Sequence, residues 1–239
     1  MSAPPLRVGT AFPDPPFDVP GPPVGGLDHD LVQAIGQRLG RPIELHPYEG
    51  SDFEGIFEEL GRSIDVVASG ATVTDHRRTL ARWCQPYVRS GQSLVVDTHQ
   101  QPDVHGTGDL SGLVLGVQKG NTSEPVAHAL HADGKVADVR IYAYDEILTA
   151  LGDLEKGTLG AFMKLEPVMR WLTADRPTLA VVQTGITDEL IALAVALDDE
   201  DLATRIDAAQ RDLATSGELA AIGRRWLHGS DPAATGMVT

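Results

Sequence analysis

The stretch Ile64-Asp-Val-Val-Ala68, followed at once by Ser69-Gly-Ala-Thr-Val-Thr-Asp-His-Arg-Arg78, says most about how this chain folds. The first part is a short apolar run typical of a buried strand. The second predicts a turn into a helix, with Thr74 as a candidate N-cap. Ligands of open α/β sheets bind where strands end at their carboxyl side. We therefore expect an α/β fold with a binding site at this turn.

Arg77 is the candidate binding residue of this turn. A cation near the start of a helix is disfavoured by the helix dipole by a few tenths of a kcal/mol, and a bound anion would compensate for it. The planar guanidinium donates two parallel hydrogen bonds to a carboxylate, which an ammonium group does not do. The alternative is a surface arginine paired with Asp75 or Asp14, and Arg78 is expected to be solvated.

The residues before this stretch repeat a pattern of strand and helix. The spacing of apolar residues predicts strands over 6–10 and 43–46, a rigid proline-rich loop over 13–17, a helix carrying Leu31, Ile35 and Leu39, and a further helix opened by a capping box over 51–54. Strands that alternate with helices at this spacing indicate βαβ units and a largely parallel sheet.

Beyond residue 78 the pattern is repeated after a polar crossover over 97–109. The predicted elements are strands over 114–117, 139–142 and 159–163, a helix over 125–131, an apolar strand or helix start over 191–197, and helices over 199–215 and 218–226. The last ten residues are expected to fray. We expect the terminal helices to return to the first lobe, so that lobe 1 holds residues 1–97 and 186–239 and lobe 2 holds 98–185.

A second candidate anion site lies in Gly116-Val-Gln-Lys-Gly-Asn-Thr-Ser-Glu-Pro125. A strand, a glycine-containing turn and a helix start follow one another there, and free N–H groups at a helix start bind anions. The glycine spacing and the terminal Gly-Lys-Ser or Gly-Lys-Thr of a phosphate-binding loop are absent. The alternative is a plain turn with Thr122 or Ser123 as the helix cap.

Composition excludes several classes of partner. Acidic residues outnumber Lys plus Arg by 34 to 19, which disfavours binding to nucleic acid and to anionic lipid. The single cysteine, Cys84, forms neither an internal disulfide nor a multi-thiolate metal site, and no spacing predicts a metal or a cofactor. No apolar run reaches the length of a membrane span. The start at Met1 lacks a signal region, so we expect either a trimmed signal or a protein that stays inside the cell.

Taken together in their order, these segments resemble the extracytoplasmic solute-binding proteins that serve ATP-driven (ABC) transporters of polar amino acids. The likeness runs from about residue 6 to 229 and rests on short motifs: Arg7-Val-Gly-Thr with Pro-Pro-Phe17, Gly26-Leu-Asp-His-Asp-Leu31, Ile64-Asp-Val-Val, the stretch 69–78, Pro86-Tyr with Ser90-Gly91, Gly116-Val-Gln-Lys-Gly, and Arg225-Trp226. It implies the two-lobed type II periplasmic-binding-protein fold, in which each lobe is a mixed, mainly parallel sheet flanked by helices and two crossovers join the lobes.

The resemblance also implies a function and a set of site residues. The function is capture of an amino acid or a related small carboxylate between closing lobes, by an extracytoplasmic monomer that passes the ligand to a membrane permease. The carboxylate-binding arginine falls on Arg77, and Phe53 falls where a side chain packs on the ligand. Backbone and hydroxyl donors fall on Gly70, Thr72 and, from the second lobe, Thr122, and the adjacent Ser69 and Asn121 complete the candidate set.

Two departures from the family pattern bear on the ligand. Leu165 stands where the family has the aspartate that binds an α-ammonium group, and leucine accepts no hydrogen bond. Either Glu166 substitutes, or another acid such as Asp14 does, or the ligand has no α-ammonium group. Asp14 itself stands where the family often has an aromatic residue, and it either reads a cationic group or pairs with a nearby arginine.

Two further functions stay open at this point. Some relatives on this fold are dehydratases of prephenate or arogenate, and Glu166 or Asp14 with a raised pKa would serve as their proton donor. No Ser-His-Asp order or cofactor loop supports any other chemistry, so we expect no enzyme activity. The other alternative is a sensor domain that keeps the fold without a transport role.

Overall fold

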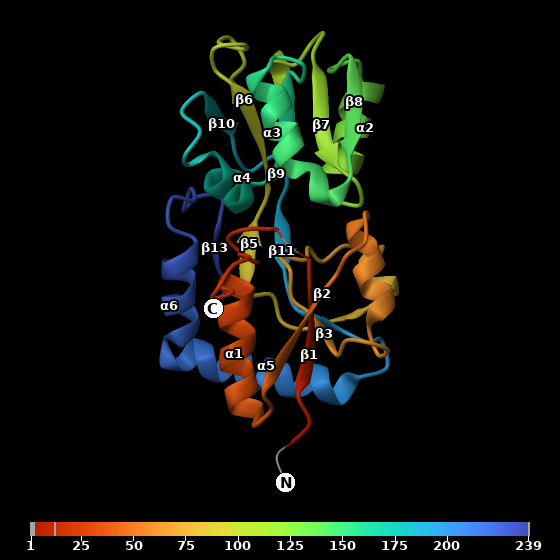
Figure 1. Ribbon diagram of the computed structural model, residues 1–239, viewed down its shortest axis with the longest axis vertical. Helices are drawn as coiled ribbons and strands as arrows, with labels where there is room; N and C mark the ends of the chain where they lie inside the picture. The colour runs from red at the N-terminus through yellow and green to blue at the C-terminus, as the bar shows by residue number, and fades with distance from the viewer. Residues whose placement is uncertain (1–2, 12, 239) are drawn as a thin grey trace.

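The chain folds into two lobes, each built on a five-stranded sheet, in a computed structural model that describes residues 3–11 and 13–238. The lobes are stacked along the long axis of the molecule (Figure 1). Met1, where a signal region was sought, and Thr239, the last of the ten residues expected to fray, lie outside the described residues. This arrangement confirms the expected two-lobed α/β fold.

The first lobe has the sheet order β2-β1-β3-β12-β4. Its strands are β1 (Leu6–Thr10), β2 (Ile43–Pro47), β3 (Val66–Val67), β4 (Arg82–Trp83) and β12 (Ala194–Val195). β1 runs parallel to β2 and β3, as predicted, whereas β12 returns antiparallel from the distant part of the chain. The helices of this lobe are α1 (Leu27–Leu39), α5 (Glu200–Ser216) and α6 (Glu218–Trp226), and they pack on one another. The C-terminal helices therefore belong to the first lobe.

The second lobe has the sheet order β10-β6-β9-β7-β8. Its strands are β6 (Gln92–Asp97), β7 (Val114–Gln118), β8 (Asp138–Tyr142), β9 (Ala161–Leu165) and β10 (Leu179–Gln183). β7 is parallel to β8 and β9, whereas β6 is antiparallel to β9 and β10. The helices that cover it are α2 (Ser123–Ala132), α3 (Ile147–Glu155) and α4 (Glu166–Thr173).

The first crossing between the lobes lies earlier in the chain than predicted. β6 hydrogen-bonds to β9 and β10 in the second sheet, so residues 92–97 do not belong to the first lobe, where the sequence analysis placed everything up to Asp97. β6 lies between β10 and β9 in this sheet, and all six of its residues are buried. An apolar strand pattern predicts burial but does not reveal which sheet supplies the neighbours.

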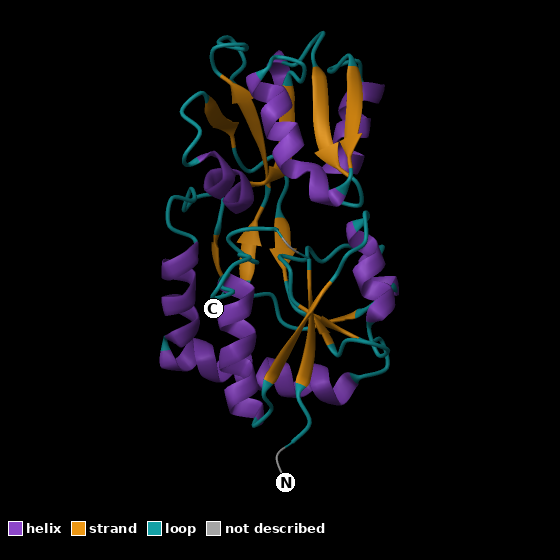
Figure 2. Cartoon of the chain, viewed as in Figure 1, coloured by secondary structure: helices purple, strands orange, loops and turns teal. Residues whose placement is uncertain are grey.

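A small third sheet, with the order β11-β5-β13, lies where the two lobes meet. It contains β5 (Val88–Ser90), β11 (Glu189–Ile191) and β13 (Gly236–Met237). Figure 2 shows that these strands lie in a region otherwise made mostly of loops. The pairing of β13 with β5 corrects the expectation of frayed final residues, since backbone hydrogen bonds hold Gly236 and Met237 in place. Near this sheet Trp171 of α4 packs against Trp226 of α6, with ring centroids 6.0 Å apart.

Two local predictions are corrected by the turns themselves. The helix after Tyr48 is a 3-10 helix, Phe53–Glu59, and its N-cap is Asp52, not Ser51: the Asp52 carboxylate accepts a hydrogen bond from the Glu54 backbone N–H at 2.9 Å. The helix expected after Ser69 is a single 3-10 turn, Arg77–Thr79. Over the described residues no helix is long and apolar enough to cross a membrane.

Candidate functional site

Arg77 lies between the lobes and is buried, with 3% of its surface exposed. Its backbone N–H donates to the Thr74 hydroxyl at 3.1 Å, although the N-cap of the 3-10 turn is His76 and not Thr74 as expected. The guanidinium donates to the carbonyl of Thr72 at 3.1 Å and, across the interface, to the carbonyl of Gly120 at 2.8 Å. Its Nε atom lies 3.4 Å from the Glu54 carboxylate. The alternative of a surface arginine paired with Asp75 or Asp14 is therefore wrong.

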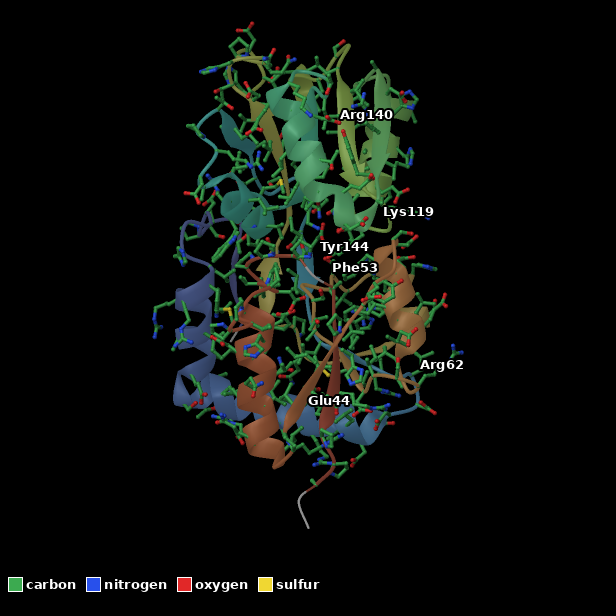
Figure 3. The ribbon with its side chains drawn as sticks, in the orientation of Figure 1. Glu44, Phe53, Arg62, Lys119, Arg140 and Tyr144 are labelled. Atoms are coloured by element: carbon green, nitrogen blue, oxygen red, sulfur yellow. The ribbon has the colours of Figure 1, made fainter. Side chains whose placement is uncertain are left out.

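The rings of Phe53 and Phe57 complete the surroundings of this guanidinium. The Arg77 Cζ atom lies 4.9 Å from the centroid of the Phe53 ring, within the range of a cation–π contact. The Phe53 ring packs against Tyr144 of the second lobe, with centroids 5.5 Å apart. Figure 3 shows the two side chains lying together where the lobes meet. Phe53 thus provides an apolar wall beside a buried cation, and its packing on a ligand stays a prediction.

A buried carboxylate, that of Glu189 on β11, accepts hydrogen bonds from both lobes. One oxygen accepts from the hydroxyls of Thr72 at 2.6 Å and Thr122 at 2.9 Å. The other accepts from the Gln92 amide at 2.9 Å and the Thr187 hydroxyl at 2.6 Å. Because its hydroxyl is used in this way, Thr122 makes no side-chain cap to α2. Thr72 and Thr122 were expected from the sequence as site residues, whereas Glu189, the acid that both contact, was not.

A buried ion pair joins the lobes beside this carboxylate. The Lys164 ammonium on β9 lies 3.0 Å from the Asp14 carboxylate of the first lobe, and their side chains are 2% and 4% exposed. The ammonium also donates to the side-chain amide oxygen of Asn121 at 3.4 Å and lies 5.3 Å from the Tyr144 ring centroid. Burial raises the pKa of Asp14, although Lys164 opposes the shift. Asp14 does pair with a cation, but the cation is a lysine that the sequence analysis missed.

We call this set of contacting side chains the interlobe cluster: Asp14, Phe53, Thr72, Arg77, Asn121, Thr122, Tyr144, Lys164 and Glu189. A cavity of about 360 Å³ opens beside it, lined by Arg77, Asn121, Thr122 and residues around them. Buried cations, a buried carboxylate, hydroxyl donors and an aromatic wall are the groups that hold a small zwitterion or a small carboxylate.

Ser69 and Gly70 have other partners than the cluster. The Gly70 N–H donates to the Asp28 carboxylate at 2.7 Å, and the Ser69 hydroxyl donates to Asp18 at 2.5 Å. Gly70 has φ +56°, and an added Cβ would meet the Phe17 ring at 2.8 Å, so glycine is required there. Ser69 and Gly70 thus donate hydrogen bonds to two buried acids, Asp18 and Asp28. Asp28 also accepts a hydrogen bond from the Tyr87 hydroxyl at 2.5 Å.

These two acids should make stability depend on pH. Burial raises the pKa of Asp28 to about 7, and burial together with the neighbouring Asp28 raises the pKa of Asp18 well above its ordinary value. From about pH 4 upward the unfolded chain therefore loses these protons before the folded chain does, and the free energy of unfolding falls until about pH 7. We expect the melting temperature to drop over this range, and to drop less in Asp18→Asn. Thermal denaturation of both proteins from pH 4 to pH 8 tests this, and parallel curves would contradict it.

Leu165 and Glu166 do not supply the missing acceptor in the cluster. Leu165 is 4% exposed and belongs to an apolar core cluster. Glu166 is fully buried, and its carboxylate accepts from Arg170 at 3.0 Å, from the Asp231 N–H at 2.9 Å and from the Thr235 hydroxyl at 2.9 Å. It faces the C-terminal segment. The interpretation that Glu166 replaces the family's aspartate in the cluster has no contact to support it.

Several known proteins resemble this chain in sequence and in fold. The family model of bacterial extracellular solute-binding proteins, family 3, matches residues 6–229. The chain is similar to the L-cystine-binding protein TcyJ of Escherichia coli (strain K12), with 27% identity over 93% of this chain and 82% of that protein. It is also similar to the structure of an ancestral arginine-binding protein bound to arginine, with 30% identity, a TM-score of 0.84, and coverage of 92% of this chain and 97% of that one.

One further comparison concerns the enzyme alternative. The structure of the ancestral amino acid-binding protein AncCDT-1, described as a precursor of cyclohexadienyl dehydratase, is 25% identical with a TM-score of 0.82. The alignment covers 93% of this chain and 95% of that one.

Proposed function

The chain belongs to family 3 of the bacterial extracellular solute-binding proteins, and from this membership we propose that it is the solute-binding component of an ABC transporter. Its ligand is an amino acid or a related small carboxylate, held between the two lobes. Relatives of this chain include proteins named as binding cystine, arginine and, with the word probable, histidine, which supports the amino-acid class.

The buried guanidinium of Arg77 is the observation that carries this proposal. A buried cation beside an aromatic wall, in a cluster that also holds hydroxyl donors from both lobes, fits a carboxylate. In the proposed complex Arg77 donates to the ligand carboxylate, the hydroxyls of Thr72 and Thr122 add further hydrogen bonds, and Phe53 packs on the apolar part of the ligand. Asn121 lies at the rim of the same site.

Ligand entry requires the lobes to part. Arg77 bonds to Gly120, Lys164 bonds to Asp14, and Thr122 bonds to Glu189, so the interlobe cluster is closed upon itself. We propose that the lobes rotate about the segments near β5 and β11, where the chain crosses between them, and that the ligand exchanges places with some of these internal contacts.

The remaining parts of the proposal follow the family. The protein acts as a monomer outside the cytoplasmic membrane and delivers its ligand to a membrane permease, with no nucleic-acid partner and no catalytic step. The similarity to a precursor of cyclohexadienyl dehydratase makes dehydration of prephenate or arogenate the competing activity. That activity needs a carboxyl group free to protonate a leaving hydroxyl, yet Glu166 is bonded to the C-terminal segment and Asp14 to Lys164.

A thermal-shift screen tests the proposal directly. The panel contains the standard L-amino acids, L-cystine, simple amines, and 2-hydroxy and dicarboxylic acids, with prephenate and arogenate included and monitored for turnover. A ligand present at 100 times its dissociation constant should add about 2.7 kcal/mol to the free energy of unfolding. A panel without any stabilising carboxylate would refute the proposed function, and turnover of prephenate or arogenate would replace it by the enzymatic one.

A further inference from the structure

Glu189 is a buried carboxylate whose charge is felt by the buried guanidinium of Arg77 without direct contact between the two groups. It is 6% exposed and accepts its four hydrogen bonds from neutral groups, three hydroxyls and an amide. The two buried cations of the interlobe cluster pair with other acids, Arg77 with Glu54 and Lys164 with Asp14. In the part of the chain that the structure describes, no ion pair to Glu189 is formed.

Neutral hydrogen bonds satisfy the oxygens of such a group, and the guanidinium of Arg77, which contacts Glu54, balances its charge only from a distance. Removing an ionised carboxylate from water is costly, and buried charges are normally paired or bound to a cation. A positive group from a ligand would provide the missing partner. The interlobe position of Glu189 makes this possible, because the carboxylate is reached by Thr72 from one lobe and by Thr122 from the other.

The position of Glu189 also matches the gap that Leu165 leaves. Gln92, whose amide donates to Glu189, stands directly opposite Leu165 in the ladder between β6 and β9. The carboxylate therefore contacts the side chain of the residue that is paired with Leu165. The other acids of the region are engaged: Asp14 with Lys164, and Asp18 and Asp28 with Ser69, Gly70 and Tyr87.

We propose that Glu189 binds the ammonium group of an α-amino acid, the role that Leu165 does not fill. This rests on the proposed function. The ammonium takes over hydrogen bonds on the Glu189 oxygens, which have about four acceptor positions, all now occupied. The hydroxyls of Thr72 and Thr122 are thereby released to donate to the ligand carboxylate beside Arg77. One exchange thus gives the Glu189 carboxylate a directly contacting cation and completes the site for the ligand carboxylate.

Isothermal titration calorimetry on the native protein and on Glu189→Gln tests this. The ligands are the standard L-amino acids and L-cystine, each compared with the 2-hydroxy acid of the same side chain. We expect Glu189→Gln to weaken amino-acid binding at least about 30-fold, as loss of one partner of a buried charge pair does, and to change 2-hydroxy-acid binding less than about 3-fold. Adding Leu165→Asp to Glu189→Gln should restore most of the lost affinity.

Asp97→Asn is the matched control, because Asp97 is also a buried carboxylate that accepts from neutral groups, at the far end of β6. It should leave both affinities unchanged. If Glu189→Gln does not fold, Glu189→Asp keeps the charge but withdraws it by one methylene group, and should weaken amino-acid binding at least about tenfold.

The outcomes separate the two proposals. Amino-acid affinity unchanged in Glu189→Gln, or in Glu189→Asp where that variant is used, overturns the inference, and so does an equal loss for amino acids and 2-hydroxy acids. A native protein that binds only 2-hydroxy acids overturns the inference while the proposed capture of a carboxylate stands. A native protein that binds no member of the panel refutes the proposed function, and the inference with it.

Discussion

Arg77→Ala should weaken ligand binding by about 2 to 5 kcal/mol, the loss that follows truncation of one partner of a buried charge pair. The guanidinium is almost fully buried between the lobes, and desolvation lowers its pKa, so it is a cation held ready in a region with little water. A ligand carboxylate would be left without its charged partner in the variant. Calorimetry with the ligand found in the thermal-shift screen measures the loss.

The control for this prediction is its neighbour. Arg78 is exposed, so Arg78→Ala should bind the ligand with native affinity. Arg77→Lys should recover only part of the loss, since an ammonium does not donate two parallel hydrogen bonds. Circular dichroism must show that Arg77→Ala is folded, because Arg77 also bonds to the carbonyls of Thr72 and Gly120. Native affinity in a folded Arg77→Ala would remove Arg77 from the site.

Asp14→Ala should lower the free energy of unfolding by about 3 to 5 kcal/mol, because it leaves the buried ammonium of Lys164 without a carboxylate. The double variant Asp14→Leu with Lys164→Met removes both charges and should be far less destabilised, since apolar side chains of similar volume often replace a buried ion pair at little cost. Urea denaturation of the native protein and both variants measures these differences.

The radius of gyration of the ligand-free protein provides a second test of this ion pair. Lys164 and Asp14 belong to different lobes, so their loss should favour separation of the lobes in the ligand-free protein. X-ray scattering should then show a larger radius of gyration for the double variant. A double variant that is no more stable than Asp14→Ala, with an unchanged radius of gyration, would show that the pair does not hold the lobes together.

The parts of the site that could be predicted are those written in one continuous stretch of sequence. Arg77 and Thr72 lie in one turn after a strand, and Thr122 lies in a turn of the same kind in the second lobe. In each case local backbone rules and the order of the motifs were enough to predict a polar group at the carboxyl end of a strand. Many strands and helices of both lobes follow from the sequence for the same reason, whereas α3, α4, β4, β5 and β10 were not predicted.

The parts that could not be predicted depend on pairs of residues far apart in the chain. Lys164 stands inside an otherwise apolar strand, and nothing in its neighbours indicates that Asp14 will face it across the interface. Glu189 follows Thr187-Asp188 in a polar segment that reads as a linker, yet β11 carries it between the lobes. The assignment of β6 to the second sheet has the same origin, since it depends on β9 and β10.

The contact between Trp171 and Trp226 gives this protein its own optical reporter. The two indoles are tilted by 38° and come from α4 and α6, which belong to different lobes. Any rotation of one lobe against the other changes their separation or their angle, and with it the polarity and quenching that each ring experiences. Trp83, the only other tryptophan, lies within the first lobe and packs on Phe57, so it supplies a steady background. Intrinsic fluorescence emission should therefore follow the motion of the lobes in solution without an attached dye.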